Sequence, residues 1–158
     1  MNCSIARSLE VIGEWWTFLI LRDAFFGITR FEEFQERLGI ARNVLSARLD
    51  TLVEHGVMER RVYDEARGRS DYKLTEKGKA LWPVLTTLRQ WGDEWVVGES
   101  GAPIEMVHTS CGAHTTGELT CSHCHQPLER RDLELVRGPG LTDPDVLPPA
   151  SRRHRSRT

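Results

Sequence analysis

The chain lacks any apolar run long enough to cross a bilayer, and its N-terminus lacks the basic, apolar and small-residue segments of a secretion signal. The longest apolar candidate, residues 15–20, is followed by Arg22 and Asp23. We therefore expect no membrane partner and a cytoplasmic location. The net charge is only −2, so the overall charge does not indicate a nucleic-acid partner, and any such evidence must be local.

Sequence patterns of catalysis are also missing. The 158 residues contain no strand–turn–helix nucleophile site, no glycine-rich phosphate loop and no paired carboxylates near a pocket. Cysteine and histidine do occur together, so a thiol hydrolase is an alternative to consider. Because the other parts of such a site are missing, we expect that the chain is not an enzyme.

Three regions differ in composition. Residues 3–100 show dense apolar periodicity, residues 101–137 are polar and rich in Cys and His, and residues 138–158 carry four prolines followed by arginines. The last region cannot bury apolar surface, so we expect a disordered tail. Its arginines, from Arg152 to Arg157, either add non-specific DNA affinity or keep the chain soluble.

The first region is expected to begin with four helices. Apolar residues recur there at spacings of three and four, and Gly27, Gly39 and Gly56 end the last three segments. The third and fourth segments are separated by a short turn, as in a helix-turn-helix unit. The four predicted helices span residues 4–12, 16–26, 31–38 and 42–55.

A hairpin and a last helix are predicted to follow. The apolar period changes to alternation over residues 57–63, and a loop with Gly68 leads to a return strand over residues 71–74. Thr75 is expected to cap one long final helix, in which Pro83 produces either a kink or a break. The predicted fold class is therefore mainly α with a small β-hairpin wing (α+β): a winged helix-turn-helix domain with a small C-terminal Cys/His segment.

The fourth predicted helix, residues 42–55, divides into an inward leucine face and an outward polar face. In a recognition helix the first turns meet base edges, where Arg pairs with guanine, Asn pairs with adenine, and Ala allows close approach or touches a thymine methyl. The alternative is a merely solvated face, which the neighbouring turn and hairpin make less favoured. Arg48 lies at the margin and either contacts phosphate or pairs with Glu32, Glu33 or Glu36. The candidate DNA-binding residues of this helix are Arg42, Asn43, Ser46, Ala47 and Arg48.

The wing adds three further candidate DNA-binding residues. Arg67 and Arg69 flank the tip, where long cations reach the minor groove or the phosphates, and Lys73 follows on the return strand. Acidic neighbours at Asp64 and Asp71 dilute this charge, so a solvated turn is the alternative. The wing supports DNA binding without proving it.

Residues 3–98 contain a series of short sequence pieces that occur in the same order in a known protein family. The matching pieces are Cys3, Trp16-Thr17, Ile20-Leu21, Arg30-Phe31, Phe34, Leu45-Ser46-Ala47-Arg48-Leu49, Leu52, Glu54-His55-Gly56-Val57, Tyr72-Lys73-Leu74-Thr75, Gly78, Pro83-Val84-Leu85 and Trp91. In these pieces the chain resembles the HxlR-type regulators, winged-helix relatives of the MarR group. It departs from the family at Ala41, where a capping Ser is usual, and at Ala66-Arg67-Gly68, where the family wing contains proline.

The resemblance implies a homodimeric transcription factor, by default a repressor, that binds double-stranded operator DNA. In such proteins the first and last helices pair the subunits, and the recognition helices enter successive major grooves about 34 Å apart. The apolar richness of the last predicted helix agrees with pairing. A winged-helix adaptor that binds proteins and not DNA is the alternative, and it would show no salt-dependent DNA binding.

Cys3 matches the N-terminal cysteine that some members of the family use to sense oxidants or electrophiles. Sensing requires a lowered thiol pKa, which the start of the first helix and Arg7 could supply. The alternative is an inert, partly buried thiol at the dimer seam.

The C-terminal segment has the ligand spacing of a small zinc ribbon. Two pairs with two intervening residues supply four ligands for one tetrahedral ion, and few apolar residues surround them. A decayed site that merely packs on the long helix is the alternative. No cofactor is expected for the DNA-binding domain itself. The candidate zinc ligands are His108, Cys111, Cys121 and Cys124.

Overall fold

The computed structural model describes residues 3–136 and 138–140, and the contacts within it divide the chain into two units. One unit comprises residues 7–117, and the other comprises residues 1–6 and 118–158. The predicted boundary at residue 100 therefore falls inside the larger unit. Most of the predicted disordered tail, including the segment from Arg152 to Arg157, lies outside the described residues. In the described part, no helix combines the length and the hydropathy needed to span a membrane.

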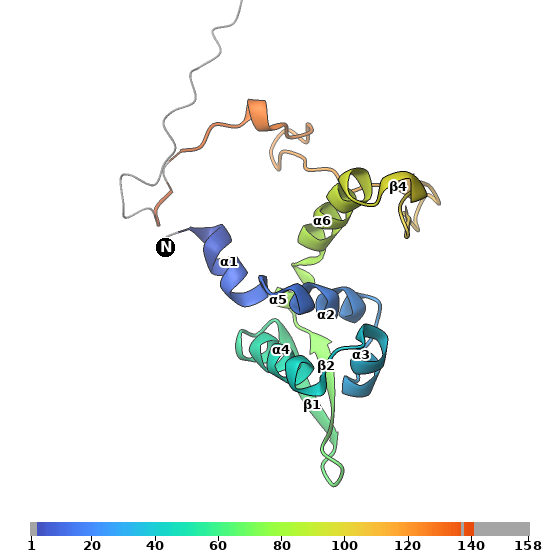
Figure 1. The fold of residues 1–158 in the computed structure, drawn as a ribbon. Helices are drawn as coiled ribbons and strands as arrows, with labels where there is room; N and C mark the ends of the chain where they lie inside the picture. Colours follow the sequence, from blue (N-terminus) through green and yellow to red (C-terminus); the bar gives the residue numbers. More distant parts are fainter. Residues whose placement is uncertain (1–2, 137, 141–158) are drawn as a thin grey trace, which may run out of the picture. The chain divides into compact units, whose positions relative to one another are not determined.

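The first four helices follow the predicted order and lie close to the predicted bounds. They are α1 (Ser4–Ile12), α2 (Trp15–Phe25), α3 (Phe31–Leu38) and α4 (Arg42–Glu54). Gly39 ends α3 with a φ of +62°, a conformation that glycine adopts without steric cost and that turns the chain directly into α4. Figure 1 shows α3 and α4 gathered about α2. The fully buried core between these helices includes Ile20, Leu21, Phe34, Leu45 and Leu49.

A buried carboxylate ties α2 to α3. The Asp23 side chain is fully buried, and its Oδ1 lies 2.9 Å from Nη2 of Arg22. Its Oδ2 lies 3.4 Å from Nε of Arg37 on α3. A buried charge is tolerated only when it is paired, so removing either arginine would weaken the connection between the two helices.

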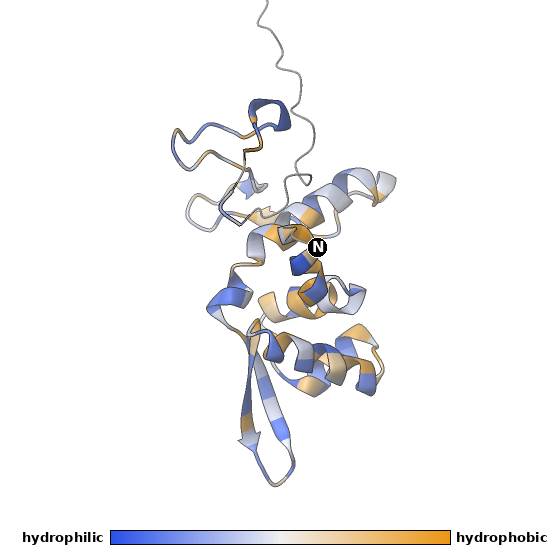
Figure 2. Cartoon of the chain, turned by 90° about the vertical axis from the view of Figure 1, so that its left-hand side faces the viewer, coloured by the Kyte–Doolittle hydropathy of each residue, from blue (hydrophilic) through white to orange (hydrophobic). Residues whose placement is uncertain are grey.

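The predicted hairpin is present and slightly longer than expected. Strand β1 (Met58–Asp64) pairs antiparallel with β2 (Arg69–Leu74), with an irregularity in register between Val62 and Asp64. Strand β2 begins two residues before the predicted start at Asp71. The backbone N–H of Tyr72 donates to the carbonyl of Thr29 at 2.7 Å, which fixes the base of the hairpin beside α3. Figure 2 shows the hairpin extending from the helices as a largely hydrophilic arm.

The prediction of one long final helix is wrong, because the chain forms α5 (Glu76–Lys79) and α6 (Trp82–Trp95). Thr75 caps only α5, where its Oγ1 accepts a hydrogen bond from the Gly78 N–H at 3.2 Å. Pro83 lies in the first turn of α6. Proline lacks an N–H and fits the first turn of a helix better than its interior, so it marks a break and not a kink.

The segment after α6 returns to that helix. It contains a 3-10 turn (Gly98–Ser100) and the small hairpin of β3 (Met106–Val107) with β4 (His114–Thr115). Gln90 on α6 holds the end of the segment through two hydrogen bonds with the backbone of Gly117, at 2.9 and 3.0 Å. These bonds explain why residues 101–117 belong to the same unit as the winged domain. In the second unit the structure has one short 3-10 turn among the described residues, Arg130–Asp132.

Candidate nucleic-acid interface

Helix α4 presents a buried face and an exposed face along its whole length. Leu45, Leu49 and Leu52 are fully buried. Arg42, Asn43, Ala47 and Asp50 are exposed, and Ser46 and Arg48 are partly exposed. The helix begins after Ala41, which gives no side-chain cap, as the sequence predicts. The packing of the leucines therefore holds the helix in place and orients its polar face outward.

The first two turns of α4 carry the side chains predicted to read bases. The Arg42 guanidinium carbon lies 4.7 Å from the centre of the Phe31 ring, so α3 supports this cation while leaving it exposed. The Ser46 hydroxyl donates to Asp50 Oδ2 at a long 3.4 Å. In the described part of the chain, the Asn43 side chain makes no hydrogen bond, so its amide is available to an incoming group.

Arg48 has a different partner from those expected. Its Nη1 lies 3.8 Å from Oε1 of Glu14, the residue before α2, and among the described residues it makes no ion pair with α3. Pairing with Glu32, Glu33 or Glu36 is therefore wrong. An exposed pair at this distance contributes about 0–1 kcal/mol, so it leaves the guanidinium free to exchange Glu14 for a phosphate.

The wing carries the remaining predicted contacts on exposed positions. At its tip the Arg67 N–H donates to Asp64 Oδ1 at 3.1 Å, and the Arg67 guanidinium lies 3.9 Å from the same carboxylate. Arg69 and Lys73 are exposed and, within the described residues, their side chains have no hydrogen-bond or ion-pair partner. The tip cation is thus partly neutralised, whereas the two cations of β2 are not.

Sequence reasoning did not single out Arg30 as a site residue. This exposed side chain precedes α3, and its guanidinium lies 5.9 Å from the ring centre of Tyr63 on β1. Its backbone forms a bridge with Asp71 of β2. Arg30 therefore adds a cation between the helix-turn-helix and the wing, a position that helical periodicity does not reveal.

Helix α6 presents a very different surface, made of uncovered apolar side chains. Leu88, Trp91 and Trp95 are 49%, 58% and 69% exposed. On α1, Leu9 and Ile5 are also exposed. A contiguous row of large apolar side chains on one helix is typical of a surface that another protein covers.

The predicted metal ligands occur in two turns of the same construction, one in each unit. In the first, the His108 N–H donates to the Ala113 carbonyl at 2.9 Å, and the Gly112 N–H donates to the His108 carbonyl at 2.7 Å. In the second, the Cys121 N–H donates to the Gln126 carbonyl at 2.8 Å, and the His125 N–H donates to the Cys121 carbonyl at 2.9 Å. Each turn therefore fixes a ligand pair with the same backbone pattern.

The two turns also share a left-handed residue immediately after the second ligand. Gly112 has a φ of +72° and His125 has a φ of +59°. In the first turn, Cys111 Sγ lies 3.4 Å from His108 Nδ1. In the second, hydrogen bonds from the backbone of Cys124 and His123 hold the pKa of the Cys121 thiol below its ordinary value. Among the described residues, no three His, Cys, Asp or Glu side chains gather as a metal site, so the four-ligand set stays a prediction.

Cys3 lies directly before α1, is partly buried and forms no disulfide in the described structure. Its position at a helix start is the one predicted from the sequence. The next cysteine along the sequence is Cys111.

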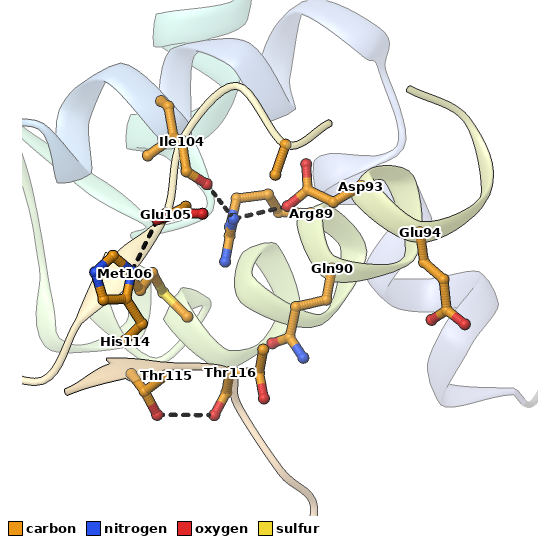
Figure 3. Close-up of a pocket in the computed structure, with 11 residues that line it drawn as sticks. Arg89, Gln90, Asp93, Glu94, Ile104, Glu105, Met106, His114, Thr115 and Thr116 are labelled. Atoms are coloured by element: carbon orange, nitrogen blue, oxygen red, sulfur yellow. Dashed lines mark hydrogen bonds and ion pairs between the residues drawn. The ribbon is translucent and has the colours of Figure 1, made fainter. Parts of the chain in front are cut away.

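An open cavity of about 640 Å³ with a mixed polar and apolar lining lies between α6 and the β3–β4 hairpin (Figure 3). Its charged groups are already paired: Arg89 Nη1 lies 2.7 Å from Asp93 Oδ2, and His114 Nδ1 lies 2.8 Å from Glu105 Oε2. Arg89 also donates to the Ile104 carbonyl at 2.7 Å. Of these contacts, the hydrogen bond from Arg89 to Ile104 connects α6 to the returning segment. Within the described residues, the groups at this cavity supply no nucleophile paired with a base.

Comparison with known proteins identifies relatives over most of the chain. The sequence pattern of the HxlR-like helix-turn-helix family matches residues 11–100. A Mycobacterium tuberculosis protein named uncharacterized HTH-type transcriptional regulator Rv3095 is 44% identical over 138 residues, which are 87% of this chain and 87% of that protein.

Solved structures resemble the chain in the same way. The crystal structure of PA1607, described provisionally as a transcription factor, superposes with a TM-score of 0.76 and 42% identity over 86% of this chain and 95% of that one. The redox regulator HypR in its reduced form superposes with a TM-score of 0.54 and 29% identity over 58% of this chain and 92% of that one. The predicted winged helix-turn-helix fold is confirmed by these likenesses.

Proposed function

Because the chain belongs to the HxlR-like helix-turn-helix family of transcription regulators, we propose that it represses transcription by binding double-stranded operator DNA through α4. The relatives are transcription regulators, and the chain is a regulator and not an enzyme. The proposal places the regulator in the cytoplasm with its DNA. The observation that carries DNA binding is the exposed start of α4, where Arg42 and Asn43 extend from a helix anchored by three buried leucines.

Each outward side chain has a defined task in this proposal. Arg42 donates to guanine O6 and N7, and Asn43 pairs with adenine N6 and N7 in the major groove. Ser46 and Ala47 line the same groove, while Arg48 and the wing residues Arg67, Arg69 and Lys73 contact phosphate or the minor groove. Phosphate contacts release bound cations, so the affinity must fall steeply as salt rises.

The test compares wild type with the double variant Arg42→Ala, Asn43→Ala on DNA from the promoter region of the chain's own gene. We expect a loss of about 10- to 100-fold in specific affinity, since each good base contact contributes about 1–3 kcal/mol of discrimination. Lys79→Ala removes one charge from α5 and is the matched control, with little change expected. Unchanged affinity and selectivity in the folded double variant would refute the proposal, and salt-independent or absent binding by wild type would favour a protein-interaction adaptor.

We propose that the protein acts as a homodimer paired through α1 and α6. The support is the exposed apolar row on α6 and the exposed Leu9 on α1. A two-fold dimer would place two α4 helices one turn of DNA apart. Sedimentation of the purified protein should give twice the mass of one chain.

We also propose that Cys3 makes this binding responsive to oxidants or electrophiles. The likeness to the redox regulator HypR and the place of Cys3 before α1 support this. After quinone or peroxide treatment, wild type should release DNA and the Cys3→Ser variant should not. Equal release by both would remove the sensing role.

Finally, we propose that His108, Cys111, Cys121 and Cys124 bind one structural zinc ion. The matching backbone pattern of the two turns supports this, because paired ligands two residues apart are typical of zinc sites. Metal analysis should find about one zinc per chain in wild type and in Cys3→Ser, and little in Cys121→Ser, Cys124→Ser. Less than about half an equivalent in wild type would count against zinc.

A further inference from the structure

A second cavity in the larger unit has a mainly apolar lining, which shares Leu88 with the proposed dimer face of α6. It measures about 350 Å³ and lies between α2, α6 and the segment that returns to α6 after residue 101. Phe18, Leu19 and Phe25 of α2 line the cavity together with Trp82 and Leu85 of the α6 side, and Ile104 of the returning segment also lines it. A cavity of this size accepts a small molecule of about ten non-hydrogen atoms and is too small for a helix.

One polar group in the wall of this cavity has no partner. Thr86 is only 8% exposed, and within the described residues its buried hydroxyl makes no hydrogen bond. The neighbouring Thr87 shows the ordinary alternative, because its hydroxyl donates to the carbonyls of Pro83 and Val84 at 3.0 and 3.1 Å. An unpaired buried hydroxyl lowers stability, so its place beside an apolar cavity points to a missing acceptor.

The charges at the cavity are already neutralised. Arg22 is paired with Asp23, and Arg89 is paired with Asp93 and with the Ile104 carbonyl, as Figure 3 shows for Arg89. The cavity therefore offers no unpaired positive charge that would favour an anionic occupant. Its chemistry selects a neutral molecule with an apolar body and one hydrogen-bond acceptor.

We propose that this cavity is a binding site for a small neutral aromatic or branched apolar molecule whose single acceptor bonds the Thr86 hydroxyl. Threonine in a helix occupies two χ1 rotamers, and rotation between them turns the hydroxyl toward the occupant. The Ile104 carbonyl fixed by Arg89 keeps the covering segment over the site. The segment lies beyond the residues that match the family pattern, so the site depends on a part of the chain outside residues 11–100.

The site is also placed to influence the DNA-binding helices. Arg22 at the cavity edge shares the buried carboxylate of Asp23 with Arg37 of α3. An occupant that shifts Arg22 acts directly on the connection between α2 and the helix preceding α4. This regulatory use rests on the proposed function, whereas ligand binding itself does not.

The test uses fluorine NMR titration of the full chain, without DNA, with two probes of matched shape. The ketone 4′-fluoroacetophenone carries an acceptor, and 4-fluorocumene replaces that acceptor by a methyl group. We expect wild type to bind both, with the ketone about 5- to 10-fold tighter, in line with one buried hydrogen bond. Thr86→Val should reduce ketone affinity to that of the hydrocarbon, and the matched control Thr87→Val should leave both unchanged.

Further outcomes separate this proposal from its alternatives. Leu19→Trp fills the cavity and should abolish binding of both probes. The proposal is overturned if wild type binds neither probe or if the ketone preference survives in Thr86→Val. It is also overturned if the probes convert dimers to monomers in sedimentation, because a second copy of the chain would then be the occupant.

The regulatory use has its own test. Saturating ketone should change DNA affinity at least threefold in wild type but not in Thr86→Val. Unchanged DNA affinity would refute the regulatory use and leave the binding site supported.

Discussion

Helices α4 and α6 each leave one face uncovered, and the two faces differ in chemistry. The outward side of α4 carries Arg42 and Asn43, which water solvates well. The outward side of α6 carries Leu88, Trp91 and Trp95, which water solvates poorly. A polar face is stable in water when its partner is absent, whereas a large apolar face is more stable when another protein surface covers it permanently. The comparison therefore supports the two proposals made above, transient DNA contact by α4 and lasting protein contact by α6.

The sharpest way to break this comparison is to charge the face of α6. In the variant Trp91→Glu, Trp95→Glu we expect monomers in sedimentation and a loss of about 100-fold in specific DNA affinity, or about 2.7 kcal/mol, because one half-site contact is lost. The control Leu135→Glu, Val136→Glu adds the same charges at exposed apolar positions outside α6. A dimeric α6 variant with wild-type DNA affinity would show that α6 serves another purpose.

A smaller effect is expected where cations contact DNA without reading it. Arg69→Ala should weaken binding about 5- to 10-fold on every sequence and reduce the salt dependence by about one unit of slope, as loss of one phosphate contact does. Arg61→Ala is the control, because Arg61 is already paired with Glu59 at 3.0 Å. Titrations at several salt concentrations measure both values. A change in sequence preference would mean that the wing also reads bases.

The helix-turn-helix was predictable because its signals are local. From the leucine spacing of α4 and the glycine after α3, the bounds of both helices were predicted to within one residue. The division between α5 and α6 could not be decided between a kink and a break at Pro83, because the apolar spacing continues through this residue and does not show where one helix ends. The pairing of Arg48 with Glu14 could not be foreseen either, because periodicity does not determine which helix packs beside which.

A stability change of intermediate size tests the support of α4 itself. Ala41→Ser should raise the free energy of unfolding by about 1 kcal/mol, because a serine at this position caps the exposed N–H groups of the helix. Denaturant unfolding measures this value. Ala47→Ser, in the second turn, is the control and should not stabilise the protein. No gain at residue 41 would mean that the turn from Gly39 cannot adopt a capped geometry.

The smallest expected effect concerns the cation at the margin of α4. Glu14→Gln removes the partner of Arg48 and should tighten DNA binding about twofold, since an exposed pair contributes only about 0–1 kcal/mol. Glu33→Gln removes a charge from α3 and serves as the control. Direct titration at low salt is the measurement. Weaker binding in Glu14→Gln would imply that Glu14 orients Arg48 for contact.

The contacts of Arg89 and Gln90 determine where this chain can accept insertions. Arg89 and Gln90, which are neighbours on α6, form hydrogen bonds with the backbone of Ile104 and Gly117. Residues 104–117 therefore form a loop whose two ends are both bound to the same helix. Closing a loop costs only about 0.6 kcal/mol more for each doubling of its length. Insertions between residues 104 and 117 that keep the His108–Cys111 turn intact should therefore leave the proposed DNA-binding surface of α4 undisturbed.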